Sequence, residues 1–136
     1  MKKCEFCELL SEKENSLKIS EISSSVAVLN RDQLFLGRVL VIHKSHVEDL
    51  SELTEKERAL SIEDLTKIAS AVKKAFNPDT LNYAILGTVV SHLHWHVIPR
   101  YKNDPNWGGP PWPHGRKYLD QEQYEKLKKR IREFLS

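Results

Sequence analysis

The sequence predicts an α+β fold in which helices cover an antiparallel β-sheet. Three observations lead to this prediction: strand-like segments fall into two groups, a long amphipathic helix separates the groups, and a second helix closes the chain. The chain has 136 residues, of which 40% are hydrophobic and 29% charged, so it is long enough to bury a core. We therefore expect one domain over residues 1–136, with residues 102–136 as its tail.

Two strands are expected before the long helix. Residues 23–30, "SSSVAVLN", carry apolar residues at the alternate positions Val26 and Val28, as in a strand with one buried face. Residues 38–44, "RVLVIHK", form a β-branched run that is typical of a well-buried strand. Gly37 is expected to break the chain before this second strand. The first 20 residues are mixed in character and predict no regular element.

The segment "SIEDLTKIASAVKKAFNP" predicts the long helix. Ser61 is expected to cap its N-terminus, because acidic residues follow in the first turn, and Asn77-Pro78 is expected to end it. A separate short helix is expected over residues 53–60, "LTEKERAL". Apolar residues recur at helical spacing along one face of the long helix: Ile62, Leu65, Ile68, Ala69, Val72 and Phe76.

Two more strands, residues 81–87 and 92–100, precede the tail. The tail begins with "KNDPNWGGPPWPHG", whose prolines and glycines exclude regular structure. A closing helix is expected over residues 119–135, where Asp120 and Gln123 resemble a capping box. Its inward face is predicted to carry Tyr124, Leu127, Ile131 and Phe134.

Two features of the tail region have more than one interpretation. Trp107 and Trp112 either pin the irregular loop to the core, which we favour, or form a rim over a ligand pocket. Arg100, at the end of the last strand, either contacts a phosphate or lies at the surface, and the surface position is the one we favour.

Charge and composition exclude several classes of protein. The net charge of +2 gives no reason to expect a nucleic-acid partner, and no apolar run is long enough to span a bilayer. The N-terminus becomes charged too early for a signal peptide, so the chain is expected to be cytoplasmic. Two cysteines in that reducing compartment argue against a structural disulfide.

Three histidines alternate in "HLHWHVIPR". Alternate residues of a strand point to one face, so His92, His94 and His96 are expected together, with Leu93, Trp95 and Val97 in the core. The outer two lie about 13 Å apart along a strand and would converge on one metal ion only with strain. A division of labour is more economical, with one histidine on a metal and the others in catalysis, where neutral imidazole is a good nucleophile toward phosphorus.

Cys4 and Cys7, in "CEFC", have the spacing of half a zinc site. A redox pair would normally follow a strand and begin a helix, and nothing upstream supplies that strand. Two ordinary buried thiols are the remaining alternative.

The motif "HLHWHVI" resembles the signature of the histidine triad (HIT) family of nucleotide hydrolases and transferases. Two further segments, "VAVLNRDQLFLGRVLVIHKSHVEDL" and "NYAILG", resemble the nucleotide-site strands that precede the motif in this family, so the likeness covers residues 4–101. The tail resembles that of diadenosine-polyphosphate-hydrolase-like members. The resemblance implies a HIT-like fold, an antiparallel meander with a long helix and a C-terminal helix packed on it, and a homodimer.

The resemblance also implies roles for individual residues. His94 would attack the α-phosphorus to form a nucleotidyl-histidine intermediate, and His96 would contact the phosphate and assist the leaving group. Asn30 occupies the ribose position. The family often has Gln or Asn before the triad, where this chain offers the shorter Thr88 and Ser91. The base and phosphate contacts implied are Phe6, Leu9 and Val28 for the base, and Gly87 and Thr88 for the phosphates.

A zinc site is implied in the same way, with Cys4, Cys7, His46 and His92 as ligands and His43 as the rival of His46. Four protein ligands would make it a closed, structural site. No organic cofactor is expected.

The expected substrate is a purine nucleotide, first a dinucleoside polyphosphate such as diadenosine tetraphosphate and second a nucleoside phosphoramidate. Phosphate could replace water as the acceptor, which would make the enzyme a phosphorylase. Two other classes stay open: a hydrolase whose triad holds a catalytic metal, and a nucleotide-binding regulatory protein with little turnover.

Overall fold

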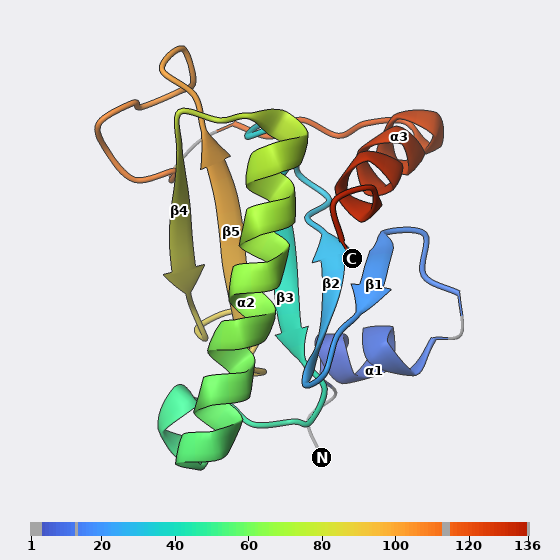
Figure 1. Ribbon diagram of the computed structural model, residues 1–136, viewed down its shortest axis with the longest axis vertical. Coiled ribbons are helices and arrows are strands. Elements are labelled where there is room, and N and C mark those ends of the chain that lie inside the picture. Colours follow the sequence, from blue (N-terminus) through green and yellow to red (C-terminus); the bar gives the residue numbers. More distant parts are fainter. Residues whose placement is uncertain (1–3, 13, 113–114, 136) are drawn as a thin grey trace.

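A five-stranded antiparallel sheet forms the centre of the computed structural model, which describes residues 4–12, 14–112 and 115–135 (Figure 1). Its strand order is β1-β2-β3-β5-β4. Neighbouring strands pair antiparallel throughout, and a bulge interrupts the register of β1. The predicted α+β class is confirmed. The strands are β1 (Lys18–Glu21), β2 (Ser25–Leu29), β3 (Val39–His43), β4 (Thr80–Ile85) and β5 (His94–Arg100).

The long helix α2 (Glu55–Phe76) crosses one face of the sheet (Figure 1). Thr54 caps it through a reciprocal capping box with Glu57, so the prediction of a helix starting at Ser61 after a separate short one was wrong. Nothing breaks the chain between the two predicted helices, and the Ser61 hydroxyl instead accepts a hydrogen bond from Trp95 Nε1 at 3.1 Å. The helix ends as predicted, with Asn77 in the left-handed conformation.

The main core lies between α2 and the sheet. Alternate residues of the central strands meet helix residues that include Leu65, Ile68, Ala69 and Val72. Ile62, predicted in this stripe, is 43% exposed, whereas Ser61 and Leu65 are buried, so the face of α2 that meets the sheet is turned away from Ile62. The predicted core positions Leu93, Trp95 and Val97 are buried or partly buried.

The C-terminal helix α3 (Gln121–Arg132) packs beside β1 and α2 (Figure 1). Asp120 and Gln123 form the predicted capping box. Phe134, predicted to face inward, lies beyond the helix end and is 38% exposed, whereas Lys128 is buried in an ion pair with Glu125 at 2.6 Å. None of the helices in the described part of the chain has both the length and the apolar composition needed to cross a bilayer.

The first 20 residues form two elements that the sequence did not predict, the helix α1 (Glu5–Ser11) and β1. Helix α1 lies on the face of the sheet opposite α2, where Phe6 packs in a second, smaller core with Val26, Val28, Leu40 and Ile42. A short 3-10 helix, η1 (Leu50–Glu52), precedes α2.

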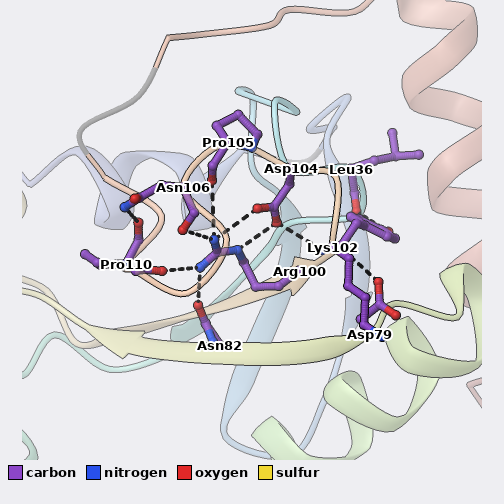
Figure 2. Close-up of polar contacts among 11 residues, drawn as sticks. Leu36, Asp79, Asn82, Arg100, Lys102, Asp104, Pro105, Asn106 and Pro110 are labelled. Carbon is purple, nitrogen blue, oxygen red and sulfur yellow. Dashed lines mark hydrogen bonds and ion pairs between the residues drawn. The ribbon is translucent and has the colours of Figure 1, made fainter.

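Arg100 organises the loop after β5 and is buried, contrary to the surface position expected from the sequence (Figure 2). Its guanidinium forms a buried ion pair with Asp104 at 2.8 Å and donates to Asn82 Oδ1 at 2.7 Å. It also donates to the backbone carbonyls of Pro105, Asn106 and Gly109. The two tryptophans of the loop stay more than 40% exposed, so an arginine rather than an indole fixes the loop.

Candidate active site and metal centre

The face of the sheet covered by α1 carries His94 and His96. Both lie in β5, where they pair with Ile42 and Leu40 of β3, and their rings lie 5.1 Å apart between centroids. Phe6 packs edge-on against His94 at 4.7 Å. The prediction of one histidine face therefore holds for these two, while His92 precedes the first residue of the strand.

One nitrogen of His94 is committed to the backbone. Its Nδ1 lies 2.6 Å from the carbonyl oxygen of His92, and because a carbonyl can only accept, Nδ1 carries the proton. Nε2 is then the nitrogen with the lone pair. Burial lowers the pKa of His94 below the usual histidine range, which keeps this lone pair unprotonated at neutral pH.

His96 has the opposite tautomer. Arg38 Nη2 donates to His96 Nδ1 at 3.1 Å, so Nε2 of the neutral ring carries the proton and can donate. Burial, together with the charge of Arg38 and the neighbouring His94, lowers the pKa of His96 to about 3. The two adjacent rings thus offer one acceptor nitrogen and one N–H donor.

Both rings open into a cavity of about 640 Å³ between the sheet, α1 and the loop before β5. Of the residues implied for a nucleotide, Phe6, Leu9, Val28, Asn30 and Thr88 line this cavity. Gly87 does not, although both its neighbours do, and its carbonyl accepts from Ser91 Oγ. Size and lining are typical of a small-molecule site, with apolar walls and a few converging polar groups.

Four metal-ligating side chains meet beside this cavity: Cys4, Cys7, His46 and His92. His92 Nδ1 lies 3.4 Å from Cys4 Sγ and 3.2 Å from His46 Nδ1, and Cys7 Sγ lies 3.3 Å from His46 Nδ1. Donors at about 2.0–2.3 Å from one tetrahedral ion are separated by about 3.3–3.8 Å. The four side chains therefore fit a tetrahedral metal ion.

The histidines of this cluster are held by their other ring nitrogens. His92 Nε2 donates to the carbonyl of His43 at 2.7 Å, which leaves Nδ1 as the lone-pair atom facing the cysteines. His46 Nε2 lies 3.9 Å from a carboxylate oxygen of Glu48. Of the two candidates at this position, His46 joins the cluster, while His43 is buried in β3 and contributes only its carbonyl.

Helix α1 joins the four side chains of the metal-binding cluster to the cavity. Cys4 caps the helix, since its Sγ accepts from Cys7 N at 3.3 Å, and Phe6 stands between the two cysteines. Phe6 contacts both His92 and His94 edge-on. An ion held by the cluster would thereby fix one wall of the cavity.

Several site residues were missed by the sequence reasoning. Arg38 is one, although strand alternation in "RVLVIHK" places it on the same face as Leu40 and therefore beside His96. Arg31 and Arg116 also line the cavity, Arg116 from the tail. No local signal predicts Arg116, because its place depends on how the tail folds back over the sheet.

Comparisons with known proteins agree with this architecture. The family model described as the HIT domain matches residues 11–103. A HIT-like protein from Mycoplasma genitalium is 37% identical over 77% of this chain and 78% of its own length. An adenosine 5′-monophosphoramidase from Schizosaccharomyces pombe is 30% identical (81% and 83%), and a bis(5′-adenosyl)-triphosphatase from Dictyostelium discoideum is 31% identical (77% and 74%).

Solved structures with a similar fold are also histidine triad proteins. A histidine triad protein from Sinorhizobium meliloti superposes with a TM-score of 0.82 at 28% identity, covering 88% of this chain and 89% of its own. A zinc-bound histidine triad family protein from Mycobacterium smegmatis has a TM-score of 0.75 at 26% identity, covering 96% and 94%. Because the matched domain spans well over half of the sequence, the chain belongs to the HIT domain family of nucleotide hydrolase-like proteins.

Proposed function

We propose that the protein is a nucleotide hydrolase that cleaves at the α-phosphate through a nucleotidyl-His94 intermediate. The observation that supports this most strongly is the tautomer of His94. The carbonyl of His92 holds the proton on Nδ1, so the Nε2 lone pair is available for attack on phosphorus in the adjoining cavity.

Two displacements at phosphorus complete the reaction. His94 Nε2 forms a bond to the α-phosphorus while the bond to the leaving group breaks. Water then displaces His94, which releases the nucleoside 5′-monophosphate and regenerates the imidazole. His96 Nε2–H donates to the phosphoryl group and the departing atom, and Arg38, through its contact with His96 Nδ1, keeps that donor in place.

We assign each part of the nucleotide to a part of the cavity. Phe6, Leu9 and Val28 form the apolar wall for the base. Asn30 receives the ribose hydroxyls; its Nδ2 donates to the carbonyl of Asp32 at 2.9 Å, so Oδ1 is the atom that accepts from the sugar. The phosphates lie between the histidines and Thr88, which lines the cavity. The backbone of Gly87, which the resemblance also implies, does not line it.

We assign zinc to the metal cluster as a structural ion. Cys4, Cys7, His46 and His92 supply all four ligands of a tetrahedral site, so no position remains for a substrate. Bound there, the ion would stabilise the N-terminal segment and would take no part in the chemistry. Among the described residues, this is the one group of side chains found that could hold a metal ion. Of the three triad histidines it includes only His92, which disfavours a catalytic metal held by the triad.

A dinucleoside polyphosphate such as diadenosine tetraphosphate is the first candidate substrate, and a nucleoside phosphoramidate is the second. The names of two relatives, a bis(5′-adenosyl)-triphosphatase and an adenosine 5′-monophosphoramidase, favour these two leaving-group classes. Phosphate as acceptor would give a phosphorylase. The homodimer implied by the resemblance stays a prediction, which the molar mass in solution tests.

Product analysis tests the proposal. The purified protein is offered diadenosine tetraphosphate and adenosine 5′-phosphoramidate side by side, with His94→Ala as the variant and Lys56→Gln, on the exposed side of α2, as the control. Cleavage of either compound, lost only in His94→Ala, is expected. Binding of AMP without cleavage of either compound would favour a nucleotide-binding regulatory protein.

A further inference from the structure

The tail completes the nucleotide cavity. Residues of the segment 115–119 are joined to the turn after β2, because Gln33 N donates to the carbonyl of Lys117 at 2.8 Å and Lys117 N donates to Asp32 Oδ1 at 3.0 Å. Tyr124 of α3 fixes the same turn by donating from its hydroxyl to the carbonyl of Arg31 at 2.7 Å. These contacts join positions more than 80 residues apart and place Arg116 at the cavity wall.

Arg116 therefore lies at the ribose end of the cavity. Asn30 Nδ2 donates to the carbonyl of Asp32, and it is Asp32 that binds the residue after Arg116. Arg31 follows Asn30 directly and lines the same cavity. Two arginines thus line the cavity that holds the residue assigned to the ribose hydroxyls, and both are solvent-exposed, so a ligand can reach them. Arg116 Nη1 also donates to the Tyr118 hydroxyl at 3.2 Å.

The charges at this end favour an anion beyond the α-phosphate. Asn30 is neutral and adds no repulsion. Asp32, on the turn, keeps its negative charge while its Oδ1 accepts from the backbone N–H groups of Leu34 and Lys117. Arg31 and Arg116 together outweigh this one carboxylate. Guanidinium groups bind phosphate through two parallel hydrogen bonds. A nucleotide with an unmodified ribose carries no phosphate at this end for the arginines to bind.

We propose that Arg116 and Arg31 form a subsite for a second phosphoryl group, carried on the 2′ or 3′ oxygen of the ribose, so that the protein prefers ribose-phosphorylated nucleotides. The proposal rests on the proposed nucleotide site and on the position of Asn30 within it. Arg116 determines specificity here; it does not touch the reacting phosphorus.

Calorimetric titration of the metal-loaded protein tests the subsite. The ligands are AMP, adenosine 2′,5′-bisphosphate, adenosine 3′,5′-bisphosphate and ADP, and the proteins are the parent chain, Arg116→Gln, Arg116→Lys and the charge-matched control Lys56→Gln. At least one bisphosphate is expected to bind about tenfold more tightly than AMP at low salt, as charge-assisted hydrogen bonds to an exposed phosphate allow. The ratio of dissociation constants should fall to near one in Arg116→Gln, recover partly in Arg116→Lys and persist in Lys56→Gln.

Each other outcome contradicts the subsite in a distinguishable way. Equal affinity for AMP and both bisphosphates overturns it and leaves the proposed function intact. A gain for ADP alone that depends on Arg116 overturns it as well, because the arginine would then bind the leaving group. Failure of AMP itself to bind at millimolar concentration overturns both the subsite and the proposed function.

Discussion

Removal of the proposed structural zinc is predicted to release α1 from the sheet while the rest of the fold stays intact. The helix has seven residues, and fixing their backbone costs about 7–14 kcal/mol at about 1–2 kcal/mol each. Phe6 is the one buried residue of α1, and its burial returns about 1.5–3 kcal/mol. The shortfall is about 4–12 kcal/mol, which is comparable with the apparent binding free energy of structural zinc in small peptides, about 10–16 kcal/mol.

Hydrogen exchange measures this directly. The peptide covering residues 5–11 should lose amide protection in Cys4→Ser or after chelation, whereas peptides of β2, β3 and β5 keep theirs. AMP affinity should fall in parallel, because Phe6 and Leu9 form part of the cavity wall. Ser11→Ala, which removes only an exposed hydrogen bond on the same helix, is the control. Unchanged protection of residues 5–11 in the metal-free protein would refute the reasoning.

Three further predictions concern single side chains. Arg100→Met should lower the free energy of unfolding by about 3–5 kcal/mol in urea titration, because it leaves the buried Asp104 carboxylate without its partner; a loss below about 1 kcal/mol would contradict this. Asn30→Ala should weaken AMP binding by about 0.5–1.5 kcal/mol in calorimetry, and unchanged affinity would place the ribose elsewhere. The pKa of His96 is lowered to about 3, so below about pH 6.5 the unfolded state binds more protons than the folded state, and the free energy of unfolding decreases as the pH decreases. His96→Asn should flatten this slope by about 1.4 kcal/mol per pH unit between about pH 6 and 4. An equal slope in both proteins would contradict the burial of a neutral ring.

Local patterns predicted the central sheet and the ends of several elements. β3 and β5 follow from β-branched and alternating residues. The capping box of α3 was recognised because its two residues, Asp120 and Gln123, lie three positions apart and bond to each other locally. Where two caps compete, as Thr54 and Ser61 do, the sequence alone does not decide. In the folded chain Ser61 lies inside α2, and its hydroxyl accepts a hydrogen bond from Trp95 of β5, a contact that the local sequence does not show.

Distant contacts explain most of what the sequence did not predict. α1 is too short to be stable alone, and its place depends on the metal cluster and on Phe6. Arg100 looks like a surface residue until the loop after β5 wraps around it, as Figure 2 shows. The candidate site was better predicted, since the triad spacing and the resemblance named the side chains that the fold brings together, while Arg38 and Arg116 needed the structure.

The most direct test of the central claim is a search for the covalent intermediate. The protein is mixed with diadenosine tetraphosphate, quenched within one turnover in denaturant at alkaline pH, digested and examined by mass spectrometry. We predict one adenylyl group on the peptide that contains His94, located on that ring by fragmentation and absent from His94→Ala. Turnover of the substrate with no adenylylated peptide at any time, or with the label on another residue, would contradict His94 as the nucleophile.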